Sequence, residues 1–150
     1  MVNSEVSGVG FSRHPLKPMS SDNVLVEAVY GLGEGLVSGE LEADRYEVSI
    51  NFFADDARFL FIFLLMLWQV SRSDFSVTSE LADKPKKLVQ QEPEEGGGVR
   101  GVAVEEEDQK RAALTDKEAV FIARLLVRLE EEMGRPQDFE WAMEGGKCYY

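Results

Sequence analysis

Residues 114–136 read LTDKEAVFIARLLVRLEEEMGRP, and this stretch decides how the chain folds. Thr115 and Glu118 have the spacing of a capping box, which predicts the start of a helix. Gly134, followed two residues later by a proline, predicts its end. Apolar residues recur between these points at helical spacing and predict one buried stripe of Ile122, Leu125, Leu126, Leu129 and Met133. We therefore expect one long amphipathic helix over about residues 115–133.

The segment after this helix, DFEWAMEGGKCYY at residues 138–150, predicts a strand, a glycine turn and the start of another strand. Side chains alternate between the two faces of a strand. Asp138 and Glu140 therefore share one face, and the opposite, apolar face, which we expect to pack on the helix, carries Phe139, Trp141 and Met143. The two carboxylates then point into a cleft or into solvent.

The first half of the chain predicts three more strands. Residues 6–13 (VSGVGFSR) combine β-formers with glycines, which indicates a close approach of neighbouring backbones. Residues 24–30 (VLVEAVY) are apolar enough to be buried on both faces, except for Glu27. Residues 45–50 (RYEVSI) alternate as a strand does. Residues 82–113 predict a hairpin followed by a charged linker, and in the hairpin Lys87–Gln91 pairs with Val99–Val104. Together these elements predict an α+β fold, mainly an antiparallel sheet with one long helix.

Composition limits the possible functions. The chain has 150 residues, 44% hydrophobic and 29% charged, which fits one globular domain. Its 16 basic and 28 acidic residues give a net charge of −12, so we expect no general nucleic-acid binding. Cys148 is the single cysteine and only one histidine is present, so the chain can form neither an internal disulfide nor a zinc cluster, and a reducing cytoplasmic setting fits. The opening MVNSEVSG lacks the pattern of a secretory signal.

One apolar run, FLFIFLLMLW at Phe59–Trp68, has three possible interpretations. A membrane-spanning helix needs about 20 residues, roughly twice this length. A buried helix or strand is the favoured interpretation, and a membrane span is the weaker alternative. A third interpretation, an insertion, follows from the resemblance described below.

Three features are candidates for chemistry. The glycines of GLGEGLVSG (31–39) fit neither a P-loop nor the dinucleotide fingerprint, so a tight structural turn is the favoured interpretation. Asp138 and Glu140 could hold a magnesium ion that bridges phosphates, although exposed carboxylate pairs are usually just solvated. His14 could accept a phosphoryl group or act as a general base, but a surface loop histidine is the favoured interpretation.

Three blocks of the chain, in order, resemble the nucleotide domain of pyruvate phosphate dikinases and phosphoenolpyruvate synthases. VSGVGFSRHP resembles the family segment SGV-x-F-T-x-x-P. VLVEAVYGLGEGLVSGELEADRYEV is similar to EA-x-YGLGE-x-LVSG-x-x-x-x-D-x-Y-x-V. ALTDKEAVFIARLLVRLEEEMGRPQDFEWAMEGGKCYY resembles the C-terminal block, which begins with LTD-E and contains PQDIEWA.

This resemblance implies a partial ATP-grasp domain over residues 1–150, in which ATP lies between two subdomains and Mg²⁺ binds its phosphates. It also implies phosphoryl transfer from ATP to a histidine on a separate swivelling domain. The phosphoryl group then passes to pyruvate, or to an antibiotic hydroxyl in the related rifampicin phosphotransferases. The implied partners are therefore ATP and the phosphohistidine and pyruvate-binding domains.

The resemblance also assigns roles to particular positions. Glu140 matches the metal-binding carboxylate of the family motif D-I-E-W. Met1 and Val2 match the hinge that lines the adenine pocket. Gly31, Gly33 and Glu34 match the glycine loop near the nucleotide. His14 stands where the family usually has Asp or Asn, and it does not match the phosphorylated histidine.

Two departures from the family pattern qualify these expectations. The family continues beyond this C-terminus with L-Q-x-RP, and a basic N-terminal subdomain precedes the matched part, so we expect weak or no binding of Mg-ATP by this chain alone. The alternative is a non-catalytic remnant or interaction module. The second departure is Ile50–Ser71, which we interpret as an insertion, because removing it joins YEVS to RSDFSVTSELADKPKKLV as an uninterrupted strand and linker.

Overall fold

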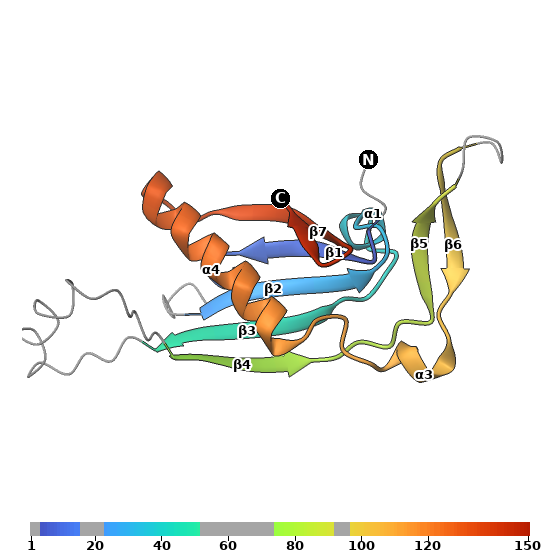
Figure 1. Ribbon diagram of the computed structural model, residues 1–150, viewed down its shortest axis with the longest axis horizontal. Coiled ribbons are helices and arrows are strands. Elements are labelled where there is room, and N and C mark those ends of the chain that lie inside the picture. The colour runs from blue at the N-terminus through green and yellow to red at the C-terminus, as the bar shows by residue number, and fades with distance from the viewer. Residues whose placement is uncertain (1–3, 16–22, 52–73, 92–96) are drawn as a thin grey trace, which may run out of the picture.

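The fold is an antiparallel sheet with one long helix across one face (Figure 1). The computed structural model describes residues 4–15, 23–51, 74–91 and 97–150. Within these ranges, six strands form one sheet in the order β4-β3-β2-β1-β7-β8, and β5 pairs with β6 separately. The strands are β1 (Val6–Phe11), β2 (Asn23–Tyr30), β3 (Asp44–Asn51), β4 (Asp74–Glu80), β5 (Lys86–Gln90), β6 (Val99–Ala103), β7 (Asp138–Glu144) and β8 (Lys147–Tyr149), and the helices are α1 (Glu34–Val37), α3 (Glu106–Gln109) and α4 (Asp116–Met133). The expected α+β class is confirmed.

Helix α4 begins and ends where the sequence predicts. The Thr115 hydroxyl accepts a hydrogen bond from the Glu118 amide at 3.3 Å, and the Glu118 carboxylate accepts one from the Thr115 amide at 2.8 Å. Gly134 closes the helix with a φ of 68°. The predicted stripe is fully buried at Ile122 and Leu126, half-buried at Leu125 and Leu129, and 56% exposed at Met133. The last turn of α4 extends past the tip of β1 (Figure 1).

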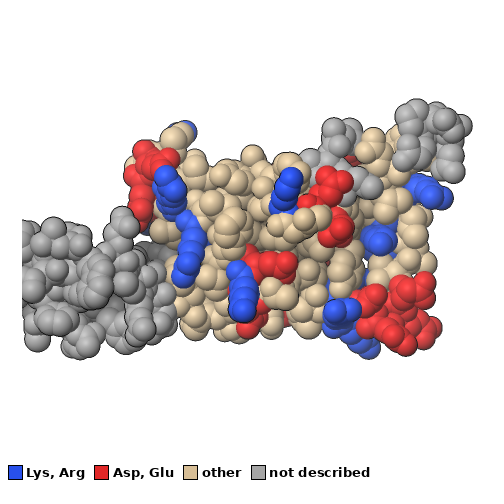
Figure 2. Space-filling model, viewed as in Figure 1, with Lys and Arg blue, Asp and Glu red and all other residues tan. Residues whose placement is uncertain are grey.

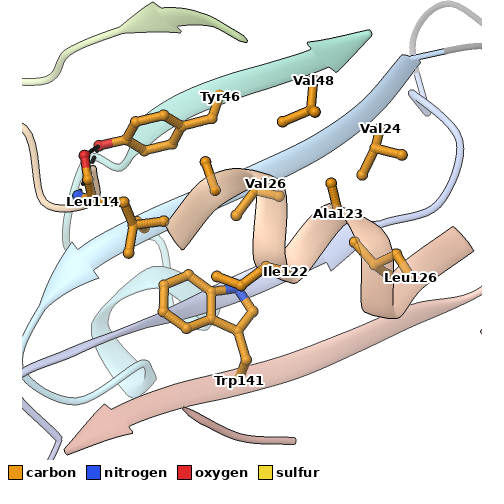
Figure 3. Packing of buried hydrophobic residues seen from close by; sticks show 11 residues of the cluster. Val24, Val26, Tyr46, Val48, Leu114, Ile122, Ala123, Leu126 and Trp141 are labelled. Carbon is orange, nitrogen blue, oxygen red and sulfur yellow. Dashed lines mark hydrogen bonds between the residues drawn. The ribbon is translucent and has the colours of Figure 1, made fainter. Parts of the chain in front are cut away.

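The core lies between α4 and one face of the sheet (Figure 3). Ile122 and Leu126 of α4 are fully buried against alternate residues of the central strands, namely Val24, Val26 and Ala28 of β2 and Tyr46 and Val48 of β3. Trp141 of β7 lies beside Ile122 and is 2% exposed. Phe139 and Met143 pack against the same cluster, which confirms the predicted apolar face of β7.

The glycines of β1 allow this close packing. A Cβ atom at Gly8 would lie 1.8 Å from the Glu27 carbonyl oxygen of β2, and one at Gly10 would lie 2.7 Å from the Leu126 side chain of α4. The strand therefore needs glycine at both positions, once for a neighbouring backbone and once for the helix. The predicted close approach of backbones is confirmed at Gly8.

A buried ion pair joins distant parts of the chain. Asp44 of β3 binds the Lys84 ammonium at 2.6 Å, and the two side chains are 0% and 2% exposed. The Asp44 carboxylate also accepts hydrogen bonds from the backbone amides of Ala82 and Ala113, both at 2.8 Å. The Lys84 ammonium lies 5.6 Å from the ring centroid of Tyr30. This pair ties β3 to the connection before β5 and to the segment that leads into α4.

Tyr46 strengthens the same junction. Its hydroxyl accepts a hydrogen bond from the Leu114 amide at 2.9 Å and donates to the Leu114 carbonyl at 3.3 Å (Figure 3). Burial raises the pKa of Tyr46 to about 12, an effect that the nearby Asp44 carboxylate adds to. The start of α4 is thereby held against the sheet by a hydroxyl that stays protonated.

The proposed insertion lies mostly outside the described residues. Its first two residues, Ile50 and Asn51, continue β3 and pair with Phe75 and Asp74 of β4. In this chain the flanking segments are the antiparallel neighbours β3 and β4, and the proposed insertion stays a prediction. The run at 59–68 falls outside the described ranges. No helix within those ranges is long and apolar enough to cross a membrane.

Candidate functional site

The sheet has a second face, opposite α4, where the expected site residues gather. Directly paired residues of antiparallel strands point to the same face. Glu140 of β7 pairs with Val9 of β1, Val9 pairs with Glu27 of β2, and Glu27 pairs with Arg45 of β3. These four residues therefore form one row across four strands. We call the surface that carries this row the open face.

Glu140 lies exposed at one end of this row, next in sequence to the buried Trp141. Trp141 fixes the strand on the core side, so the Glu140 carboxylate must project from the open face. Within the described ranges, no hydrogen bond or ion pair occupies this carboxylate. Glu140 thus has the orientation and the unused acceptor oxygens that a metal ligand requires.

The glycine loop meets the open face at Ser7 of β1. Gly31 has a φ of 76°, and its carbonyl oxygen accepts hydrogen bonds from the hydroxyls of Ser4 at 2.9 Å and Ser7 at 2.6 Å. A Cβ atom at Gly31 would lie 2.1 Å from the Leu88 carbonyl oxygen of β5. Ser7 is two residues before Val9 on the same face of β1. The loop is therefore fastened about 7 Å along the strand from the row that contains Glu140.

The remaining predicted residues of this loop are less constrained. Gly33 lies over Ser7, because a Cβ atom there would lie 3.4 Å from the Ser7 hydroxyl. Glu34 is exposed and begins the single turn of α1. Met1 and Val2, the expected hinge residues, lie outside the described part of the chain. The structure thus brings Gly31, Gly33 and Glu140 to neighbouring parts of one face.

Metal ligands are sparse in the part of the chain that the structure describes. No three side chains of the types His, Cys, Asp and Glu gather there in a metal-binding cluster. Mg²⁺ commonly keeps several waters and binds through one or two carboxylates together with substrate phosphates. A single exposed carboxylate on the open face fits that pattern, whereas it would not fit a metal bound by protein alone.

His14 is not the surface loop residue that its sequence context suggests. It is 6% exposed, and its Nε2 atom lies 3.3 Å from the Glu47 carboxylate of β3. Glu47 is 33 residues away in sequence, so inspection of the neighbouring sequence could not find this partner. A buried histidine in contact with a carboxylate is poorly placed to receive a phosphoryl group from a separate domain.

Sequence reasoning also missed an ion pair on the open face. Glu27 interrupts an apolar strand, and the structure places its carboxylate 2.9 Å from the Nε atom of Arg45. The sequence did indicate that Glu27 has a partner, because a charged residue within a buried strand requires one. Its identity depended on the pairing of β2 with β3, which composition alone does not reveal.

On the α4 side of the molecule, the largest acidic patch lies over α3 and away from the middle of the sheet (Figure 2). That patch includes Glu106, Glu107 and Asp108. A hollow of about 270 Å³ lies at the C-terminal end of β2, where the glycine loop begins, and is lined by Tyr30, Leu41 and Lys86 among others. Of the predicted site residues that the structure describes, none lines this hollow, so the open face remains the candidate site.

Comparison with known proteins identifies the family. Residues 1–149 match the family described as "Pyruvate phosphate dikinase, AMP/ATP-binding domain". The chain belongs to this family. Its similarity to members of the pyruvate phosphate dikinase AMP/ATP-binding family extends over nearly the whole chain, so the expected relationship is confirmed.

Curated relatives carry the name phosphoenolpyruvate synthase. The chain is 30% identical over 155 residues to the phosphoenolpyruvate synthase of Pyrococcus furiosus, covering 99% of this chain and 16% of that protein. It is 32% identical over 149 residues to the "probable phosphoenolpyruvate synthase" of Archaeoglobus fulgidus, with 99% and 16% covered. The corresponding values for the protein of the same description from Methanocaldococcus jannaschii are 30% over 151 residues, with 99% and 10% covered. The chain thus spans less than a fifth of the length of these relatives.

Proposed function

We propose that this chain is the ATP-binding part of a multidomain phosphotransferase that passes phosphate from ATP, through a phosphohistidine, to pyruvate. The membership in the AMP/ATP-binding family and the names of the relatives support this function. The observation that carries it is the exposed Glu140 carboxylate on the open face, the face on which Ser7 of β1 also holds the glycine loop. We further propose that the domain is part of an ATP-grasp fold, with the nucleotide lying between this open face and a second subdomain.

Each residue has a separate part in this proposal. Glu140 would hold Mg²⁺ together with the phosphate oxygens, and Met1, Val2, Gly31, Gly33 and Glu34 would shape the nucleotide pocket. Bound Mg²⁺ would neutralise the charge that develops on the phosphate oxygens during transfer. The chain's own residues would position the nucleotide, since positioning and electrostatics supply most of the catalysis of phosphoryl transfer.

The charge of the chain indicates how it would act. With a net charge of −12, the chain by itself offers little attraction for a triphosphate. We propose that most of the cationic residues that bind phosphate belong to the rest of the enzyme. Binding of Mg-ATP by this chain alone should therefore be weak, in the millimolar range, which corresponds to about −4 kcal/mol.

A titration followed by NMR tests this function. Millimolar Mg-ATP should shift the backbone amide signals of Val9, Gly31 and Gly33 in a saturable way, and Glu140→Gln should weaken the binding about tenfold or more. Glu131→Gln is the matched control, because it removes the same charge from an exposed site on α4 and should leave the binding unchanged.

Two outcomes would contradict the proposal. Equal weakening by both variants would mean that only the total charge matters and that Glu140 is no ligand. An absence of shifts at saturating millimolar Mg-ATP would instead favour the alternative, a non-catalytic remnant or interaction module.

A further inference from the structure

Glu27 is the residue of β2 that the sequence leaves unexplained. It lies within an apolar strand, yet its side chain is 18% exposed and does not point into the core. The pairing of β1 with β2 and of β2 with β3 places it on the open face, between Val9 and Arg45. Glu27 therefore belongs to the same row as Glu140, with Val9 between the two carboxylates.

The contact between Glu27 and Arg45 uses only part of the guanidinium group. The Nε atom of Arg45 lies 2.9 Å from the Glu27 carboxylate, and the Arg45 side chain is 59% exposed. A guanidinium carries five N–H donors in a fixed planar fork. The observed hydrogen bond occupies the Nε donor, so the terminal amines stay available to a ligand on the open face.

A cation on the open face would offset the negative charge of the acidic side chains around it. Besides Glu27, the row and the neighbouring positions of the same face carry the acidic side chains of Glu47, Glu80, Asp138 and Glu140. A triphosphate would be repelled by these carboxylates unless positive groups offset them. Arginine binds phosphate in two-pronged fashion and keeps its charge at any physiological pH.

The spacing of the row suits a ligand held at both ends. Neighbouring strands lie about 4.8 Å apart, so the Cα atoms of Glu140 and Arg45, which are three strands apart, are separated by about 14 Å. Both side chains are long and exposed, and Val9 and Glu27 lie between them. Val9 is uncharged, and the charge of Glu27 is offset by its contact with Arg45. A metal-bound polyphosphate lying across Val9 can therefore contact Glu140 through the metal and Arg45 directly.

We propose that Arg45 binds a phosphate group of the nucleotide and that Glu27 is a positioning residue that holds the Arg45 guanidinium in place. This inference rests on the proposed function and adds a cation to the phosphate-binding side of that site. The ligand class is the magnesium complex of a nucleoside triphosphate, recognised at Arg45 by its phosphates and not by its base.

Three variants test this inference in the whole chain. Arg45→Gln should weaken the binding of Mg-ATP and of Mg-tripolyphosphate by the same factor, about tenfold, because both ligands present the same phosphates. Arg100→Gln removes an equal charge from the exposed face of β6 and should leave both affinities unchanged. Glu27→Gln should weaken binding about threefold in the native background and have no effect in the Arg45→Gln background, as expected if Glu27 acts through Arg45.

An NMR signal of the Arg45 side chain distinguishes direct contact with the ligand from a general change in structure. The side-chain Nε–Hε resonance of Arg45 should shift on addition of Mg-ATP, while the thermal midpoint of Arg45→Gln should fall only slightly, because the guanidinium side of its contact with Glu27 is exposed. Equal effects of Arg45→Gln and Arg100→Gln would overturn the inference, because total charge would then explain them. If Glu140→Gln removes binding and Arg45→Gln does not, this inference fails while the proposed function stands. If the native chain binds neither ligand, both fail.

Discussion

The two faces of the sheet are made from alternate residues of the same strands, yet the side chains on the two faces have different surroundings. On the α4 side, every strand of the six-stranded sheet contributes to a packed core. Among the described strand residues on that side, the one charged residue, Asp44, is fully paired by Lys84 and backbone amides. On the open face, Glu140 and Arg45 are exposed and have donors or acceptors to spare. The comparison teaches that the α4 side provides stability, whereas the open face keeps exposed charged groups that, under the proposed function, would contact a ligand.

Consecutive residues of β7 show the same division. Trp141 is 2% exposed against α4, while Glu140 next to it is exposed on the other side. Changes on the α4 side should therefore alter the free energy of unfolding and changes on the open face should alter binding. The following predictions test this separation.

The largest effect is expected for the buried ion pair. Asp44→Ala leaves the Lys84 ammonium buried without a counter-charge and should lower the free energy of unfolding by about 3–5 kcal/mol. Denaturant unfolding followed by circular dichroism measures this loss. Adding Lys84→Met to Asp44→Ala should recover part of it, because the second change removes the unpaired charge. A double variant less stable than Asp44→Ala would contradict the assigned role.

Trp141→Ala should lower the free energy of unfolding by about 3 kcal/mol through the cavity that it leaves under α4. The value lies at the low end for a tryptophan, because within the described residues the Trp141 Nε1 atom has no hydrogen-bond partner, so its burial already carries a cost. The neighbouring change Glu140→Ala should stay within about 0.5 kcal/mol of the native chain. Comparable losses for the two variants, measured in urea, would break the distinction between the faces.

Alkaline pH should weaken the α4 side through Tyr46. Its pKa is raised to about 12 in the folded chain, from an ordinary value of 10.0, so the contribution is fully present below pH 10 and is lost as pH rises through about 12. The shift corresponds to about 2–3 kcal/mol. Unfolding measured between these pH values should show this decline, and Tyr46→Phe should flatten it. A decline of the same size in Tyr46→Phe would assign the effect to another group.

Gly31→Ala should lower the free energy of unfolding by about 1–3 kcal/mol, because it places a side chain at positive φ. It also brings a Cβ atom to 2.1 Å from the Leu88 carbonyl oxygen. Gly39→Ala is the matched control, since Gly39 has a φ of 73° and its Cβ atom would meet nothing within 4 Å. The difference between the two variants, measured by thermal unfolding, isolates the contact with β5. Equal losses would show that this contact does not constrain the loop.

Local patterns predicted much of this architecture. The capping box of Thr115 and Glu118 located the start of α4, and period-two alternation placed Trp141 inward and Glu140 outward. Both signals are local, because they depend on residues a few positions apart. Met133 was misplaced because periodicity describes the helix and does not say how far the sheet beneath it extends.

The remaining features depend on contacts between distant segments. Lys84 is 40 residues from Asp44, and Glu47 is 33 residues from His14, so no local pattern links either pair. The same holds for Glu27 and Arg45, whose contact follows from the register of β2 and β3. Single residues of the candidate site, such as Glu140, could be proposed from sequence, whereas the row that surrounds Glu140 required the sheet.

The most direct measurement of the central proposal replaces Mg²⁺ with Mn²⁺ and follows the broadening of amide signals in the presence of ATP. We expect the broadening to centre on Val9 and Glu140, to extend along the row to Glu27, and to disappear in Glu140→Gln. Broadening that centres instead on Glu106–Asp108 of α3, or that persists unchanged in Glu140→Gln, would contradict a metal-bound nucleotide on the open face.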